Sequence, residues 1–196
     1  AYDRALEHLS SARAAKPNNA FHHQWVGFAH YAQGDFEAAR AALEEGLSMY
    51  AYMHDALNIL GLSRFQSGDR NGARAAYQQV LTINPSQSDA LNNLGYLEYE
   101  DGNLELALDL LSRSVRENPD SAEARFHLAL ALTGRGALAE ASAELEQVVR
   151  DQPDMARAWN AWGMALMQMG QPAAAEEKFT RAVELDPERD DARMQR

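Results

Sequence analysis

The sequence predicts an all-α solenoid, a stack of similar helix pairs, and three observations carry this prediction. Prolines recur at intervals of 34 residues, at Pro85, Pro119, Pro153 and Pro187. Between successive prolines the apolar residues follow helical spacing in two runs, which predicts two amphipathic helices. A glycine separates the two runs in every unit. A fixed period of this length is typical of proteins whose repeats stack on their neighbours.

The period divides the chain into five full units and two incomplete ends. The first 19 residues are expected to form the second helix of a truncated repeat, which ends at Lys16-Pro17. Residues 190–196 are expected to begin a further helix or a tail. No linker interrupts the register, so we expect a single domain over residues 1–196. The full units are 20–53, 54–87, 88–121, 122–155 and 156–189, and their first helices are expected near 20–33, 54–67, 88–101, 122–135 and 156–169.

Small residues stand at three fixed places of each unit. Glycine at the fifteenth place supplies the left-handed backbone that ends the first helix and lets the second fold back. Alanine at the twentieth place, and glycine or alanine at the eighth, let the two helices approach closely. The fifteenth places are Gly34, Gly68, Gly102, Gly136 and Gly170, the twentieth are Ala39, Ala73, Ala107, Ala141 and Ala175, and the eighth are Gly27, Gly61, Gly95, Ala129 and Gly163.

Large apolar residues surround these small ones and form the expected core. They include Trp162, which we assign to packing, not to ligand binding. On the first helices they are Val26, Leu60, Leu94, Leu128 and Trp162, and on the second helices Leu43, Tyr77, Leu111, Leu145 and Phe179.

This pattern resembles the tetratricopeptide repeat (TPR) family, over residues 1 to about 189. That family combines a large apolar residue, Leu-Gly, a later alanine, an aromatic residue and a terminal proline. Leu91, Leu94, Gly95, Ala107, Leu111 and Pro119 carry the pattern in the third unit, and Trp159, Trp162, Gly163, Ala175, Phe179, Ala182 and Pro187 carry it in the fifth. The resemblance implies a right-handed superhelix of antiparallel helix pairs, with the first helices lining a concave groove.

The sequence departs from the pattern at Ala51, where proline is expected. The surrounding turn, Met49-Tyr50-Ala51-Tyr52-Met53, is unusually apolar. Two alternatives follow: the helix continues through this turn, or the turn is a contact surface.

Composition narrows the classes of partner. The formal net charge is -11, which disfavours nucleic acid and anionic membrane surfaces, since both attract clustered Lys and Arg. Cysteine is absent, so disulfides and thiolate chemistry are excluded. No apolar run is long enough to span a membrane. Two lysines against sixteen arginines, with many alanines, favour a bacterial source, either cytoplasmic or periplasmic.

No catalytic or cofactor-binding pattern is present in the sequence. Metal-binding patterns of His and Cys and phosphate-binding glycine loops are missing, so we expect no enzyme activity, cofactor or metal. The alternative kept open is a transition-metal site shared by His22, His23 and His54. Paired acids such as Glu44-Glu45 are most simply solvated faces.

Function is therefore expected on the surface of the first helices. The resemblance places exposed concave residues at the second, fifth, ninth, twelfth and thirteenth places. Side-chain amides at the fifth place can both donate to and accept from a peptide backbone. Aromatic and apolar rows at the ninth and twelfth places would anchor side chains. The candidate partner-binding residues are Phe21, Gln24, Phe28, Tyr31, Asn58, Leu62, Phe65, Asn92, Tyr96, Tyr99, Phe126, Asn160, Met164 and Met167.

These rows predict a non-enzymatic interaction and assembly scaffold that binds a peptide or protein segment. Two structural alternatives compete with this prediction. The ninth-place residues would pack between adjacent repeats, and the amides would act as caps or simply face solvent. By family analogy the role lies in pilus, secretion or envelope assembly; the alternative is a regulatory or substrate-recruiting arm of a larger enzyme, and a third is a structural spacer. The chaperone-tail clamp of some family members is not expected, because Arg157 is the only cation at a suitable place. Leu9, Phe179 and Val183 are expected to be partly uncovered, which predicts a longer parent protein or self-association through the solenoid ends.

Overall fold

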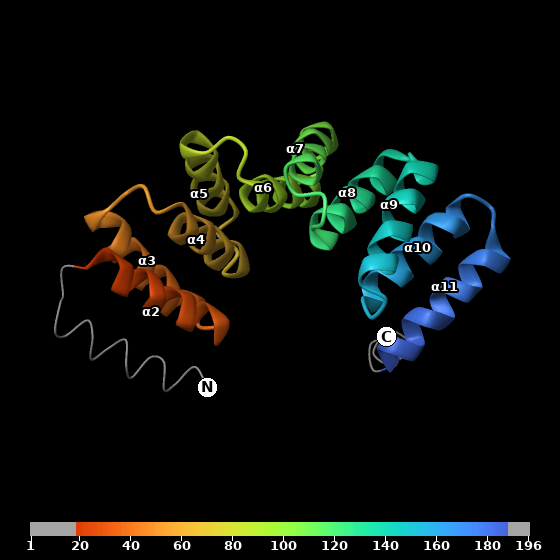
Figure 1. Cartoon of the computed structure of the whole chain (residues 1–196), viewed down its shortest axis with the longest axis horizontal. Coiled ribbons are helices and arrows are strands. Elements are labelled where there is room, and N and C mark those ends of the chain that lie inside the picture. The colour runs from red at the N-terminus through yellow and green to blue at the C-terminus, as the bar shows by residue number, and fades with distance from the viewer. Residues whose placement is uncertain (1–18, 188–196) are drawn as a thin grey trace. The chain divides into compact units, whose positions relative to one another are not determined.

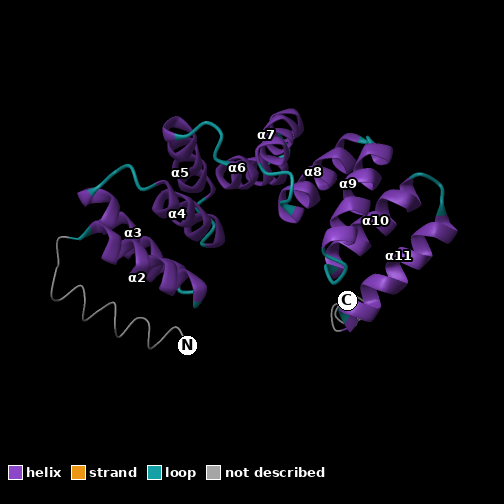
Figure 2. Cartoon of the chain, in the orientation of Figure 1, coloured by secondary structure: helices purple, strands orange, loops and turns teal. Residues whose placement is uncertain are grey.

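The computed structural model describes residues 19–187, and this part of the chain contains helices and turns but no strand (Figure 2). The helices expected within residues 1–19 and 190–196 lie outside it. The chain order of the helices can be followed in Figure 1. Their bounds are α2 (Ala20–Ala32), α3 (Phe36–Met49), α4 (His54–Gln66), α5 (Arg70–Ile83), α6 (Ser88–Glu100), α7 (Leu104–Glu117), α8 (Ala122–Arg135), α9 (Leu138–Asp151), α10 (Ala156–Gln168) and α11 (Pro172–Leu185). The all-α prediction is confirmed, and each expected first helix begins at the predicted residue.

The fifteenth-place glycines end the first helices as predicted. All five have positive φ, between 74° and 84°, and no other described residue does. A Cβ at these positions would meet nothing within 4 Å, so it is the backbone conformation, not space, that selects glycine here. Polar side chains start several helices: Asn19 accepts a hydrogen bond from the Phe21 N–H, and Ser121 accepts one from the Ala124 N–H.

The small residues let the two helices of a unit pack closely. The five twentieth-place alanines are all fully buried. At the eighth place, a Cβ on Gly61 would lie 2.8 Å from Tyr77 Cδ1, and one on Gly163 would lie 2.7 Å from Phe179 Cδ1. Those distances are shorter than van der Waals contact, so the aromatic rings of α5 and α11 occupy the space that a side chain would need.

By its internal contacts the chain forms two compact units, each larger than a 34-residue repeat: Ala1–Leu97 is called the first unit below and Glu98–Arg196 the second unit. In the first unit α2 packs on α3, α3 on α4, and α4 on α5. In the second, α7 packs on α8, α8 on α9, α9 on α10, and α10 on α11. The single domain expected from the unbroken register stays a prediction.

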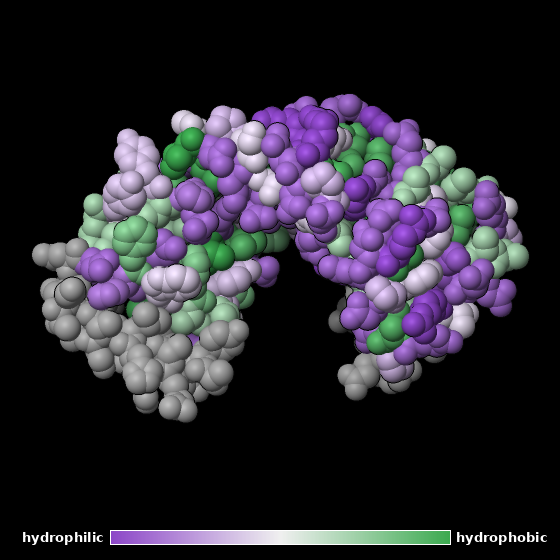
Figure 3. All heavy atoms as spheres, viewed as in Figure 1, coloured by the Kyte–Doolittle hydropathy of each residue, from purple (hydrophilic) through white to green (hydrophobic). Residues whose placement is uncertain are grey.

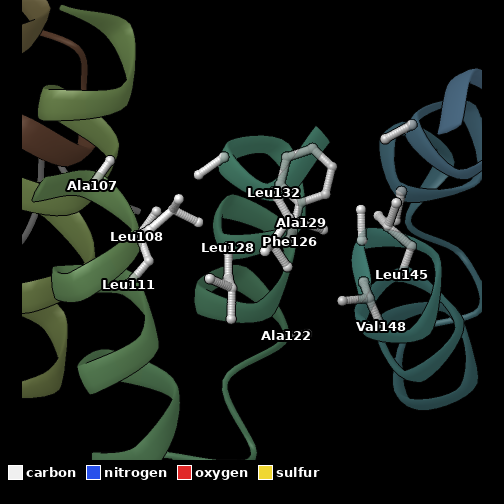
Figure 4. Packing of buried hydrophobic residues seen from close by; sticks show 14 of the residues in the cluster. Ala107, Leu108, Leu111, Ala122, Phe126, Leu128, Ala129, Leu132, Leu145 and Val148 are labelled. Atoms are coloured by element: carbon white, nitrogen blue, oxygen red, sulfur yellow. The ribbon is translucent and has the colours of Figure 1, made fainter. Parts of the chain in front are cut away.

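Each unit has its own apolar core. In the second unit, leucines of α7 and α8 interlock with Leu145 and Val148 of α9, around the fully buried Ala129 (Figure 4). In the first unit, Leu43 and Leu60 pack together with Met53. Such cores join neighbouring helices only, which is the packing expected of a repeat protein.

The turn between the first two 34-residue repeats is not helical. Helix α3 ends at Met49, Tyr50 has extended backbone with φ −147° and ψ 101°, and α4 begins at His54. The structure therefore excludes the continuous helix that the absence of proline at Ala51 had left open.

Candidate functional site

The candidate residues of one first helix share a face because of their spacing. On α4, Asn58, Leu62 and Phe65 stand at i, i+4 and i+7, so they lie above one another along the helix. On α2, Gln24 and Phe28 have the same spacing. Helices α2, α4, α6 and α10 therefore each offer an amide at the fifth place, next to apolar side chains at the ninth and twelfth places, whereas α8 has Phe126 at the fifth place.

In the first unit the aromatic side chains of this face contact one another. The Phe65 and Tyr96 rings meet edge to face, with centroids 6.0 Å apart. The guanidinium of Arg70 lies 5.4 Å from the Phe65 ring centroid, a cation–π distance. Trp25 meets Phe28 edge to face at 5.4 Å. Aromatic groups from α2, α4 and α6 are thus held by their neighbours before any ligand arrives.

The candidate residues fall into three classes of exposure. Phe21, Met164 and Met167 are exposed, by 57%, 45% and 51%. The buried ones are Gln24, Asn58, Asn92 and Phe126, and the half-buried ones are Phe28, Tyr31, Leu62, Phe65, Tyr96, Tyr99 and Asn160.

The burial of the fifth place corrects an expectation. Gln24, Asn58, Asn92 and Phe126 were expected on the exposed surface, yet each is 8% exposed or less. The physical reason is that successive first helices pack directly on each other, as α2 does on α4 and α8 on α10. Side chains at this place therefore lie low, against the neighbouring helix.

Asn58 stands out among these buried amides. Its Oδ1 is buried and accepts no hydrogen bond from any described residue. An unpaired buried acceptor costs about 1–3 kcal/mol relative to a paired one. This cost is removed if a ligand or an ordered water supplies an N–H or O–H donor beside α4.

In the second unit, charged groups gather at the start of α8 and α10. Glu123 and Arg157 stand 34 residues apart, at the same place of consecutive repeats, and form an ion pair. The Arg157 guanidinium also lies 4.8 Å from the centroid of the Phe126 ring. Arg157, considered above as a clamp for a carboxylate, is therefore already neutralised by a carboxylate of this chain.

His127 lies beside this pair, with 8% of its surface exposed. Burial, and after it the positive charge of Arg157, lower the pKa of His127 from 6.5 to about 4. The Glu123 carboxylate, 3.4 Å from His127 Nε2, would favour the protonated form. Because this carboxylate is shared with Arg157, we consider burial the stronger effect, so His127 is neutral near pH 7.

Helix α10 carries apolar side chains of two kinds. Met164 and Met167 are exposed on α10, as an adaptable apolar patch requires. Trp162 is half-buried against the core, stacked on Trp159 at 5.8 Å and covered by Lys178, as expected for packing. Figure 3 shows that, over the face in view, apolar patches are separated by hydrophilic surface.

A hollow of about 740 Å³ lies along α11. Met167, Phe179 and Val183 are among its apolar lining residues, and Glu176 and Glu184 are among its acids. Val183 is 39% exposed and Phe179 is half-buried, in agreement with the expectation that both are partly uncovered.

Two features of these surfaces were missed by the sequence argument. Trp25 is 54% exposed and lies beside Phe28. It stands at the sixth place of its repeat, where the other repeats carry Ile59, Asn93, His127 and Ala161. A tryptophan at a place without a large aromatic residue elsewhere was the available signal. The Glu123–Arg157 pair was also missed, and opposite charges one period apart could have indicated it.

Neither a metal centre nor a membrane span emerges from residues 19–187. No three His, Cys, Asp or Glu side chains of this region are grouped closely enough to hold a metal ion. None of its helices combines the length and the apolar character needed to cross a bilayer.

Comparison with solved structures finds the same architecture. MamA from Desulfovibrio magneticus RS-1 superposes with a TM-score of 0.74 at 23% identity, over 86% of this chain and 95% of the other. YrrB, described as a TPR protein with an unusual peptide-binding site, has a TM-score of 0.71 at 21% identity, over 93% and 94%. A chain of the Cut9–Hcn1 complex has a TM-score of 0.88 at 15% identity, over 95% of this chain and 37% of the other.

Comparison with protein families gives the same assignment from sequence. A search of curated proteins returns no match. Three tetratricopeptide repeat models match successive segments, one at residues 27–87 and 60–122, a second at 98–162 and a third at 156–189. These matches extend across most of the chain and include all or part of each helix pair described above. The chain belongs to the tetratricopeptide repeat family.

Proposed function

We propose that this protein is a non-enzymatic interaction scaffold that holds a peptide or protein segment against its first helices. The observation that carries the proposal is the first-unit face on which the unpaired Asn58 Oδ1 lies below the half-buried Leu62 and Phe65. A peptide backbone brings N–H donors of the kind that this oxygen lacks. Its side chains can pack on the aromatic groups, which are frequent anchors of protein interfaces.

Similar proteins support the proposal. YrrB, whose fold this chain shares, is described as having a peptide-binding site. A finer part of the proposal, by family analogy, is a role in assembling bacterial surface or secretion machinery. If the chain instead recruits substrates for a larger enzyme, its binding face would be the same and only the captured partner would differ.

The first experiment identifies the segment that binds. The chain is immobilised, partners from the source cell are captured and crosslinked, and the crosslinked peptides are identified by mass spectrometry. Crosslinks to α2, α4 and α6 are expected. A synthetic copy of the captured segment then serves as the ligand for variants.

Asn58→Leu should separate binding from folding. Leucine keeps the branching of asparagine at Cγ and removes the unpaired buried acceptor, but it is larger, so the two effects oppose each other and the melting temperature should change little. Affinity for the synthetic segment should fall about tenfold, which corresponds to about 1.4 kcal/mol. Tyr96→Ala should weaken binding similarly. Leu106→Ala serves as the matched control, because Leu106 is an exposed apolar residue of α7 that is not a candidate binding residue.

A different result would contradict the peptide-binding proposal. If Asn58→Leu lowers the melting temperature while affinity per folded molecule is unchanged, the amide serves packing. Unchanged affinity in both Asn58→Leu and Tyr96→Ala would remove the first-unit face from the proposal.

Self-association through the hollow along α11 is a further part of the proposal. Its apolar residues Val183 and Met167 are exposed, and a second copy could cover them. Light scattering should then show a mass that grows with concentration and falls back in Val183→Glu, because a buried unpaired charge opposes association. A strict monomer over a wide concentration range would contradict it.

A further inference from the structure

The turn between the first two 34-residue repeats, residues 49–53, exposes aromatic groups that are not part of the buried core. Tyr50 is 51% exposed, Tyr52 is 66% exposed and Met49 is 41% exposed. The three later turns carry Asn84, Asn118 and Gln152 where Tyr50 stands, and Ser86, Asp120 and Asp154 where Tyr52 stands. A contiguous exposed apolar patch on one turn, with polar residues on its counterparts, indicates an interaction site.

This turn is held in place from below. Met53 is buried, with 4% exposed, and packs with Leu43 and Leu60. The Tyr50 N–H donates to the Gly46 carbonyl at 3.0 Å, which fixes the backbone at the end of α3. The Tyr50 and Tyr52 rings meet edge to face at 6.1 Å. The two rings are therefore presented outward on an anchored backbone, which reduces the ordering cost of binding.

The chain on either side of the turn carries charge of one sign, apart from histidine. Residues 41–63, which include the turn, contain no Lys or Arg. Glu45 and Asp55, on the two helices that the turn joins, are both exposed. Among the residues that the structure describes, Glu45 pairs with His23 at 3.2 Å and Asp55 pairs with His54 at 3.4 Å. A cation is the ligand that tyrosine faces flanked by carboxylates attract.

We propose that residues 49–53 are a docking point for an arginine-bearing extended segment of a partner protein. A guanidinium can stack on a tyrosine face and also donate to a carboxylate, which an ammonium does less well. An anionic membrane is the less favoured partner, because carboxylates flank the turn. This surface lies on a turn, apart from the helix faces proposed above for peptide binding, so each proposal can fail alone.

Three short fluorescein-labelled peptides test the docking point, with repeats of Arg-Ser-Gly, Lys-Ser-Gly and Gln-Ser-Gly. Their binding to the full chain is followed by fluorescence anisotropy. We expect the arginine peptide to bind about fivefold more tightly than the lysine peptide, since guanidinium stacks better on tyrosine. The glutamine peptide should bind weakest.

Variants of the turn decide which surface is responsible. Tyr50→Ala with Tyr52→Ala removes both rings and no charge, so general attraction between the acidic chain and a basic peptide is retained. The preference for arginine should be lost in this variant and retained when both residues are changed to Phe. Both variants should melt like the unaltered chain, because the rings are exposed.

Three outcomes would overturn the proposal. They are equal binding of the arginine and lysine peptides, an arginine preference that survives the double alanine variant, and no binding of any basic peptide. Co-sedimentation with phosphatidylglycerol vesicles that depends on the two tyrosines would assign the turn to a membrane instead.

Discussion

Gly61→Ala should destabilise the first unit by about 2–3 kcal/mol, near the upper end for overpacked cores. The new Cβ would lie within 3 Å of three atoms of the Tyr77 ring, which is 1% exposed and has no room to move. Alanine favours a helix over glycine by up to about 1 kcal/mol, so overpacking wins over propensity. Urea unfolding at neutral pH measures the loss.

The chain itself provides the matched control for this prediction. In the fourth 34-residue repeat, Ala129 stands at the place of Gly61, and Leu145 stands at the place of Tyr77. Both Ala129 and Leu145 are fully buried. The pair Gly61→Ala with Tyr77→Leu copies that arrangement. It should be more stable than the two single changes predict by about 1–2 kcal/mol, as expected for residues in contact. Strict additivity would show that Gly61 is not selected by the Tyr77 ring.

Gly61 also illustrates what could be predicted from the sequence. Helix starts, the glycines with positive φ and the buried alanines follow from local backbone rules and from a strict period. A glycine at the eighth place indicated a close approach of two helices. Its partner atoms could not be predicted, because they depend on how the Tyr77 ring turns within the packed unit.

The candidate site was less predictable than the fold. The period identified which residues share a face, but not how deeply each side chain lies. Gln24 and Asn58 are buried because neighbouring first helices approach closely, and this distance is a property of packing. The exposed turn at Tyr50 and Tyr52 was visible as a departure from the period, which needs no tertiary information.

His127 should make the protein less stable in mild acid. In the unfolded chain its pKa is near 6.5, whereas burial and Arg157 lower it to about 4 in the folded chain. The neutral form that folding requires is present in both states above pH 6.5. As the pH falls from 6.5 to 4, only the unfolded chain gains the proton, so the stabilisation is progressively lost. The pKa difference corresponds to a loss of up to about 3 kcal/mol.

Two variants isolate this effect from the titration of carboxylates. His127→Gln keeps a hydrogen-bond donor near the position of Nε2 and cannot be protonated, so its unfolding free energy should fall by about 3 kcal/mol less between pH 7 and pH 4. Arg157→Gln removes the nearby positive charge and leaves Glu123 to favour the protonated ring. It should therefore raise the pKa of His127 and reduce the acid loss. Urea unfolding across this pH range gives the free energies, and the NMR signal of the His127 ring gives the pKa directly. A ring that titrates near pH 6.5 in the folded chain, or an equal acid loss in His127→Gln, would show that burial of His127 does not control the acid stability of the second unit.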